Sequence, residues 1–238
     1  MFRPLLISLC LTSTALATTW TVDDDGKADF DNIQAAVDAA SDGDEIIVMP
    51  GTYTSTGDNV VDMMGKAVWL HSSKGAEVTI IDGESVRRGI LCINSETPNT
   101  IIEGFTITNG YANGFWPEDS GGGMHNDYSS PTLTNCVLNE NTATEDGGGT
   151  YNRNSSPALT YCTFIGNTAD DDDGGMYNYS NSSPTLTNCT FSINTAEDYG
   201  GGMHNDVGGS PTIENCTFTG NTAIEHGGGG MSNEANSN

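Results

Sequence analysis

The sequence predicts an all-β solenoid, specifically a parallel β-helix, on the strength of three observations. One pattern in the second half of the 238-residue chain, at residues 121–126, 130–136 and 141–143, occurs four times. Its cysteine recurs at steps of 26 or 27 residues. Each period contains three short strand-like stretches and no helical periodicity. A fixed period of this length is typical of a solenoid, in which stacked coils bury a core that no single coil can bury.

The first seventeen residues predict a secretory signal peptide. Arg3 is followed by an apolar run at residues 5–16 and by small residues at a cleavage-like site. The run is too short to span a membrane, and we expect no transmembrane helix in the mature chain. We expect one β-helix domain, divided into an N-terminal cap with the first strand (18–50), irregular coils (51–120) and regular repeats with an incomplete last coil (121–238).

Residues 29–40 predict an amphipathic helix that caps the N-terminal end of the solenoid. Asp31 can serve as the N-cap, with Gln34 as its capping-box partner. The first strand is expected at residues 45–48. A helix here would cover the core and the open strand edge. The other end of the chain shows no such cap, which indicates a truncated chain or part of a longer surface protein. The apolar stripe of the helix contains Ile33, Ala36, Val37 and Ala40.

Aligning the coils sorts their residues into columns that run along the solenoid axis. Each coil is expected to contribute three short strands, such as residues 124–126, 132–134 and 136–138. The cysteine column is expected to be buried and reduced, because stacked side chains point in parallel and cannot bridge well. It contains Cys136, Cys162, Cys189 and Cys216, below Phe105. A second inward column is expected to contain Cys92, Met124, Thr150, Met176, Met203 and Met231.

Asparagine dominates three further columns. Two of them alternate with glycine, which predicts left-handed backbone at those positions. In all three, stacked side-chain amides can bond to one another along the axis. The first column contains Gly104, Asn135, Tyr161, Asn188 and Asn215. The second contains Gly110, Asn141, Asn167, Asn194 and Asn221. The third contains Asn94, Asn126, Asn152, Asn178, Asn205 and Asn233.

The chain is strongly acidic, with a formal net charge of −25. Nucleic acid and anionic membrane surfaces are therefore excluded as expected partners, because their phosphates would be repelled. The cysteines are spaced by the repeat and not in close pairs, which disfavours a disulfide scaffold or a zinc site. The expected partner is a polysaccharide or a cell-surface protein.

Two sets of residues in the regular coils are candidates for a binding site. His125, Tyr151, Tyr177 and His204 flank the methionine column and are expected to face outward, where a flat row of rings could hold sugar faces. The alternative is an ordinary cross-strand row on an exposed sheet. Beside the row, Arg153 is expected one coil from Asp127, in an exposed ion pair of little energetic weight.

An acidic stripe is the candidate metal site. Asp119, Asp146, Asp173 and Asp198 each precede a glycine run, and Glu225 does so in the fifth coil. Stacked carboxylates repel unless they are hydrated or share a hard cation, and Ca²⁺ takes oxygen ligands of this kind. The alternative is a solvated acidic loop. No other cofactor is expected.

Two stretches of the chain resemble known families. Residues 29–53, with Gly51-Thr52-Tyr53 after the first strand, resemble the opening segment of pectin-lyase-like right-handed β-helix proteins. The coils from residue 121 resemble the repeats of polymorphic outer membrane proteins, in which a Gly-Gly motif alternates with Phe-x-x-Asn. The second motif stands here at residues 164–167, 191–194 and 218–221, whereas the Gly-Gly motif departs at its end.

These resemblances imply a right-handed coil and two classes of function. The repeats imply a surface-exposed adhesin, and the β-helix enzymes imply a lyase, esterase or hydrolase of polysaccharides. The paired aspartates of polygalacturonases and the Gln/Asp/Arg set of pectin methylesterases are missing from the sequence. In β-helix lyases an arginine or lysine can take a proton beside calcium, a role open here to Arg153. The sequence therefore predicts a secreted or cell-surface structural or adhesive module, with a calcium-dependent polysaccharide lyase as the alternative.

Overall fold

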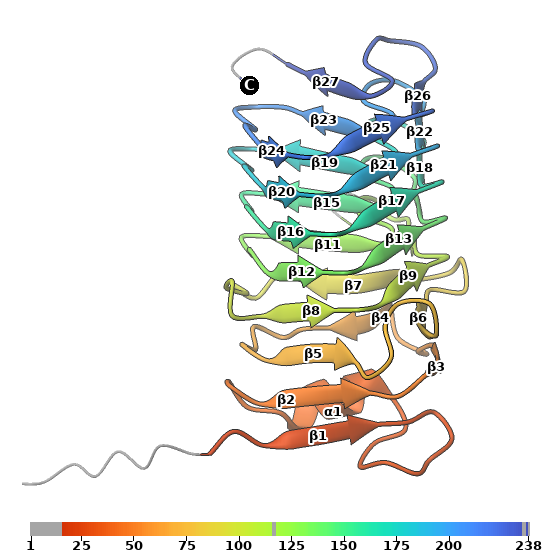
Figure 1. Ribbon diagram of the computed structural model, residues 1–238. Helices are drawn as coiled ribbons and strands as arrows, with labels where there is room; N and C mark the ends of the chain where they lie inside the picture. The colour runs from red at the N-terminus through yellow and green to blue at the C-terminus, as the bar shows by residue number, and fades with distance from the viewer. Residues whose placement is uncertain (1–15, 116–117, 235–236, 238) are drawn as a thin grey trace, which may run out of the picture.

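The computed structural model is a parallel β-helix that describes residues 16–115, 118–234 and 237. The predicted signal peptide lies almost entirely outside the described residues. Figure 1 shows the strands of successive coils stacked along one axis, with the helix at the N-terminal end. All the strand pairs are parallel and build four sheets along the solenoid. The fold class predicted from the repeat is confirmed.

The four sheets are named A to D. Sheet A contains β1 (Thr19–Val22), β2 (Glu45–Val48), β5 (Trp69–Ser72), β8 (Ile101–Glu103), β12 (Thr132–Thr134), β16 (Ala158–Thr160), β20 (Thr185–Thr187) and β24 (Thr212–Glu214). Sheet B contains β3 (Gly51–Tyr53), β6 (Thr79–Asp82), β9 (Thr106–Thr108), β13 (Val137–Asn139), β17 (Thr163–Ile165), β21 (Thr190–Ser192) and β25 (Thr217–Thr219).

Sheet C contains β4 (Asn59–Asp62), β7 (Arg88–Cys92), β11 (Met124–Asp127), β15 (Thr150–Arg153), β19 (Met176–Tyr179), β23 (Met203–Asn205) and β27 (Met231–Asn233). Sheet D contains β10 (Tyr111–Ala112), β14 (Thr142–Ala143), β18 (Thr168–Ala169), β22 (Thr195–Ala196) and β26 (Thr222–Ala223). Each regular coil thus adds a fourth, two-residue strand to the three predicted. The first strand also begins earlier than predicted, because β1 precedes the helix.

The cap is the short helix α1 (Ile33–Ala39), which packs against β1, β2 and β4. Its N-cap is Asn32, whose side chain accepts from the backbone N–H of Ala35 at 2.8 Å, so the prediction of Asp31 was wrong by one residue. Gln34 makes no capping box and accepts instead from the backbone N–H of Asp62 at 2.7 Å. The predicted apolar stripe is confirmed as buried.

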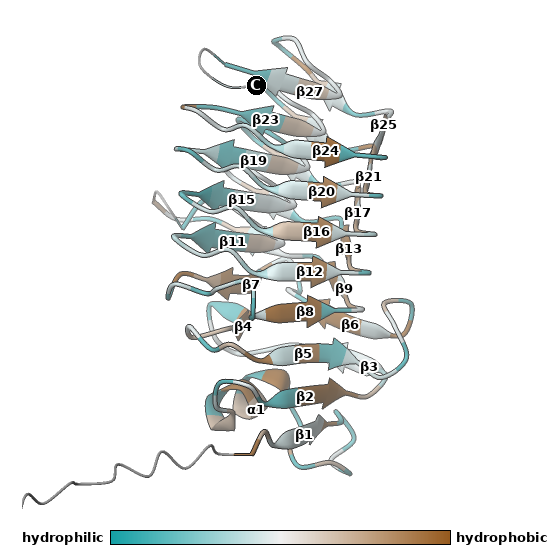
Figure 2. Cartoon of the chain, turned by 60° about the vertical axis from the view of Figure 1, so that its left-hand side comes forward, coloured by the Kyte–Doolittle hydropathy of each residue, from teal (hydrophilic) through white to brown (hydrophobic). Residues whose placement is uncertain are grey.

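The interior columns follow the prediction in the regular coils but not where the irregular coils begin. Met124 pairs in register with Ile90, whereas Cys92 pairs with Asn126. Cys92 therefore lies in the asparagine column and not in the methionine column, and Asn94 lies beyond β7. The coil before the first repeat differs in length from the repeats. Its residues therefore lie two positions away from the predicted columns. The hydrophilic ends of β11, β15, β19 and β23 stand out in Figure 2.

Two asparagine ladders join the regular coils along the axis. In one, the amide of Asn126 donates to Asn152 at 2.8 Å, and the pattern continues through Asn178 and Asn205. In the other, Asn141 donates to Asn167 at 2.9 Å, and each asparagine also accepts from the backbone N–H one coil away. The predicted amide bonding is confirmed in these two columns, whereas the described asparagines of the first column form no ladder, and Asn135 there is exposed. Because the ladder amides are buried, they fix the register of the stack.

Left-handed backbone is confirmed in the first asparagine column, where even Tyr161 has a φ of +54°. It is absent from Asn141, Asn167, Asn194 and Asn221 of the second column, for which the prediction was wrong. There the left-handed residue comes one position earlier, and the asparagine itself turns inward to build the ladder. The left-handed residues are Asn109, Glu140, Gly166, Ile193 and Gly220.

The five described cysteines are free, as predicted. In the repeats, each thiol lies in contact with a backbone carbonyl oxygen of the preceding coil. Cys162 and Cys189, for example, lie 3.7 Å from the carbonyl oxygens of Leu133 and Leu159. Cys136, Cys162 and Cys189 are buried, whereas Cys216 is half-buried.

Candidate functional site

The four rings predicted to stack do form a continuous row on sheet C. His125, Tyr151, Tyr177 and His204 are register partners in β11, β15, β19 and β23. Their ring centroids are 5.0, 5.5 and 5.3 Å apart along the row. The stacking predicted from the repeat is therefore confirmed.

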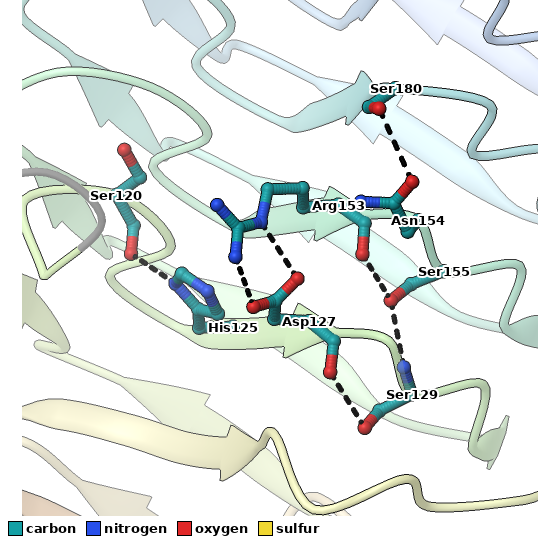
Figure 3. Close-up of polar contacts among 8 residues, drawn as sticks. All are labelled: Ser120, His125, Asp127, Ser129, Arg153, Asn154, Ser155 and Ser180. Atoms are coloured by element: carbon teal, nitrogen blue, oxygen red, sulfur yellow. Dashed lines mark hydrogen bonds and ion pairs between the residues drawn. The ribbon is translucent and has the colours of Figure 1, made fainter.

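The expectation that this row is exposed was wrong. All four rings are between 1 and 6% exposed, although they lie outside the main hydrophobic core. The turn before each strand folds back over the row, and Ser120 places its carbonyl oxygen 3.1 Å from Nδ1 of His125 (Figure 3). Glycine permits this approach, since a Cβ on Gly200 would lie 2.7 Å from Cβ of His204. The rings therefore form a layer of their own between sheet C and the turns that cover it, outside the main hydrophobic core.

Burial sets the charge state of the row. Desolvation, with a smaller contribution from the charge of Arg88, lowers the pKa of His125 to about 4. Burial likewise lowers the pKa of His204 and raises that of Tyr177. The imidazoles are therefore neutral at neutral pH. Because all four rings are buried, they do not present flat faces to a sugar.

The four predicted aspartates do not share one column. Backbone hydrogen bonds run from Glu145 to Asp119, from Asp171 to Glu145 and from Asp198 to Asp171, so that column is Asp119, Glu145, Asp171 and Asp198. We name it the acidic ridge. Asp146 lies one position beyond the ridge residue of its turn, Glu145, and Asp173 lies two positions beyond Asp171. The four aspartates do not all stand at the same distance from the left-handed glycine position of their turns, and Asp173 occupies that position itself.

Asp173 occupies a position that other coils give to glycine. Its φ is +67°, where Gly147 and Gly200 have +65° and +58°. The side chain is completely buried and accepts from the backbone N–H of Met176 at 3.3 Å and from that of His204. These bonds hold the turn against the ring row, so Asp173 is not available on the surface.

Two groups of possible metal ligands share the ridge residue Asp198. Oxygens of Asp171, Asp172 and Asp198 lie within 4.8 Å of one another, as do ligand atoms of Asp198, Glu225 and His226. Burial raises the pKa of Asp172 to about 7, with the charge of Asp171 as the next cause. Crowded carboxylate oxygens fit the ligand preference of Ca²⁺, which would supply the missing positive charge.

Burial also affects Asp146, in the turn beside the ridge. It raises the pKa of this carboxyl to about 8, with the neighbouring charge of Asp172 as the second cause. Asp146 and Asp172 stand at equivalent places in successive coils, because Gly121 donates its backbone N–H to Asp146 and Gly147 donates to Asp172. The turn therefore concentrates acidic groups that favour either a proton or a cation.

Arg153 forms the predicted ion pair with Asp127 on the adjacent strand. Nε donates to Oδ1 at 2.7 Å and a terminal nitrogen donates to Oδ2 at 2.5 Å (Figure 3). Both side chains are less than one-fifth exposed, so the pair is more buried than predicted. The hydrogen bond to Asp127 raises the pKa of Arg153. This geometry keeps the guanidinium protonated.

A groove that the sequence did not reveal lies where the irregular coils meet the regular ones. Its volume is about 330 Å³, and its lining includes Asp58, Arg88, Glu118 and His125. Arg88 is buried and donates to the backbone carbonyl oxygens of Glu118 and Ser120 at 2.9 and 3.0 Å. No repeat points to Arg88, because β7 lies in an irregular coil and the repeated pattern begins only at residue 121.

Parallel coils closed by short turns, with stacked inward columns, define a β-helix protein. The family model described as right handed beta helix region matches residues 66–238, and the chain belongs to that family. Among solved structures, the chain is similar to a pectin methylesterase from carrot, with 11% identity, 94% of this chain and 90% of that chain covered, and a TM-score of 0.44. A search of curated proteins found no match. Across the described residues, no helix is long and apolar enough to cross a membrane.

Proposed function

We propose that the protein is a secreted or cell-surface β-helix module with a structural or adhesive role. The observation that carries this proposal is how the regular coils use their polar and aromatic side chains. The ring row is buried, and the asparagine amides bond from coil to coil. The rings that the sequence suggested for sugar binding therefore stiffen the stack instead. A stiff stack suits a module that bears load or displays its outer faces to a partner.

Calcium is a second part of the proposal. Asp171, Asp172 and Asp198 would coordinate the ion through the oxygens that already lie close together. The chain carries a formal charge of −25, so bound cations would relieve repulsion between successive turns. A secreted or surface protein meets calcium at concentrations that suit sites of modest affinity.

The alternative function is a polysaccharide-active enzyme of the calcium-dependent lyase type. The groove beside Arg88 favours it, because buried and acidic groups converge there. The residue that the sequence suggested as base argues against it. Arg153 is held by Asp127, which raises its pKa, and a base must give up its proton to act.

Binding and turnover, measured on the same materials, distinguish the two functions. The full chain is incubated with acidic and neutral polysaccharides in the presence of calcium, and new reducing ends and unsaturated products are quantified. In parallel, fluorescently labelled protein is tested for retention on intact cells and on insoluble polysaccharide. An unrelated acidic protein of similar mass is the control for charge.

Retention without product release is the expected result. Turnover of any polysaccharide would overturn the adhesive proposal and favour the enzyme, with Arg88 and Arg153 as the first residues to substitute. Retention no greater than that of the control protein, without turnover, would contradict the adhesive role.

A further inference from the structure

An exposed indole stands on the outer face of sheet A, on a different sheet from the ring row. Trp69 begins β5, which lies between β2 and β8 (Figure 1). Alternation along this strand buries Leu70 in the core and turns Trp69 and His71 outward. The indole is 40% exposed. Tryptophan is enriched at binding interfaces because its ring is apolar and its N–H is polar.

Neighbouring strands hold this indole in one orientation. Its Nε1 donates to a carboxylate oxygen of Glu103 on β8 at 3.1 Å. On its own strand the ring of His71 stacks on it, with centroids 4.1 Å apart and planes 23° apart. His71 is held in turn by Glu45 of β2, 3.0 Å from Nε2. A ring fixed in this way loses little conformational entropy when a ligand covers it.

A hollow of about 520 Å³ opens against the indole. Its walls include Asp42 and Gly43 from one turn, Asn99 from another, and Ile101, which begins β8 and pairs in register with Trp69. His71 does not line the hollow, so the ligand would meet Trp69 on the side that His71 leaves free. Both walls carry polar groups at the rim.

The rim offers hydrogen-bonding groups of a definite kind. Asp42 uses Oδ1 to accept from the backbone N–H of Ala67 at 2.9 Å, while its Oδ2 takes part in no hydrogen bond within the described part of the chain. Asn99 is exposed and can both donate and accept. Carboxylate and amide groups around an aromatic face match the hydroxyls at the edge of a pyranose ring, whose C–H face is apolar.

We propose that this hollow binds a neutral polysaccharide, with one sugar ring stacked on the free face of Trp69. The proposal rests on the adhesive function and names its ligand class. Neutral sugars are favoured because Asp42 and Asp44 line the hollow and the carboxylate of Glu103 is bonded to the indole itself. Uronate or sulfated chains would be repelled by these groups and by the net charge of the protein.

Affinity electrophoresis of the full chain tests the site. Native gels contain hydroxyethyl cellulose, xyloglucan or galactomannan as neutral probes, and polygalacturonate as the acidic one. The wild type is expected to be retarded by at least one neutral probe and not by polygalacturonate. Trp69→Ala should weaken that retardation by about tenfold or more. Tyr161→Ala removes an exposed ring from another part of the surface and should leave retardation unchanged.

A second substitution separates binding from folding. Asn99→Arg leaves Trp69 in place and sets a long side chain across the hollow, where it can pair with Asp42. It should abolish retardation while circular dichroism and thermal unfolding match the wild type. Addition of the neutral probe should also change tryptophan fluorescence in the wild type and not in Trp69→Phe.

The outcomes distinguish this site from the adhesive function. Equal retardation of wild type and Trp69→Ala would overturn the site while leaving adhesion intact. The same conclusion would follow if the wild type is retained on cells but retarded by none of the neutral probes. A wild type that binds neither cells nor any polysaccharide would contradict both proposals.

Discussion

At the scale of single residues, Ile193 is the clearest departure from the backbone preferences of its type. Its φ is +56°, a region that β-branched residues rarely adopt. In the adjacent coils, Gly166 and Gly220 occupy the same column and reach this conformation without strain. The side chain of Ile193 is 63% exposed, so packing does little to offset the backbone cost.

Replacing this isoleucine should stabilise the protein. Ile193→Asn is expected to raise the free energy of unfolding by about 0.5–1 kcal/mol, because asparagine tolerates left-handed backbone. Urea unfolding followed by circular dichroism measures the change. Ile224→Asn is the matched control, since Ile224 is 59% exposed but has no positive φ. A loss of stability in Ile193→Asn equal to that of the control would show that the backbone there carries no strain.

At the scale of structural elements, the asparagine ladders restrict the residue types at their positions most strongly. The amide of Asn167 donates to the backbone carbonyl oxygen of Leu138 and to Asn194, both at 2.9 Å. Its oxygen accepts from the side chain and from the backbone N–H of Asn141. One side chain therefore satisfies buried groups in both neighbouring coils.

Removing that side chain should be costly. Asn167→Ala leaves several buried donors and acceptors without partners, and we expect a loss of roughly 2–4 kcal/mol in the free energy of unfolding. Asn139→Ala removes a half-buried amide that makes one hydrogen bond of 3.3 Å, and it should cost less than about 1 kcal/mol. Chemical denaturation of both variants checks the difference. Equal losses would mean that the ladder adds no more than an ordinary surface contact.

The turns carry their own prediction, which concerns pH. The pKa values of Asp146 and Asp172 are raised to about 8 and about 7, from an ordinary value of 3.8. The folded protein therefore binds more protons than the unfolded chain between about pH 4 and pH 8. The contribution of the pair to stability is greatest below about pH 4 and falls as the pH rises to about 8.

The double variant Asp146→Asn/Asp172→Asn isolates this effect. Burial of His125 lowers its pKa to about 4, so its contribution to the free energy of unfolding rises with pH up to about 6.5. This contribution is the same in the double variant and the wild type and cancels in their difference. The difference in the free energy of unfolding between double variant and wild type should therefore grow from pH 5 to pH 8 in the absence of divalent ions. A difference that is constant across this range would contradict the predicted shifts.

At the scale of the whole molecule, the charge of the chain predicts a response to cations. Calcium at millimolar concentration should raise the melting temperature by a few degrees relative to chelator, because it binds the folded ridge and not the unfolded chain. Sodium chloride at equal ionic strength controls for screening. Asp171→Asn/Asp198→Asn should remove the part of the shift that exceeds the salt effect. A wild-type shift no larger than that in sodium chloride would rule the site out.

The sequence predicted the stack well, because its period reflects a strict register. Residues one period apart are neighbours, which is why the repeat alone predicts the pair of Asp127 and Arg153. Alternation also predicted the direction of Tyr151 but not its burial, since the turn that covers it comes from a segment with no strand pattern. The turns also differ in length, so Asp173 was assigned to the wrong column. Trp69 and Arg88 lie in the irregular coils that precede the repeated pattern, so no column of repeated residues pointed to them.

The hydrogen bonds of the asparagine ladders have a consequence for how the gene of this protein can evolve. Each ladder bond between regular coils joins two asparagines that are 26 to 28 positions apart. Duplication of one complete period would therefore insert a coil whose asparagines meet asparagines above and below. The molecule would lengthen by about 4.8 Å with no new interface to evolve. Unequal recombination within the repeats can thus vary the reach of the protein in single coil steps while preserving its end cap and its outer faces.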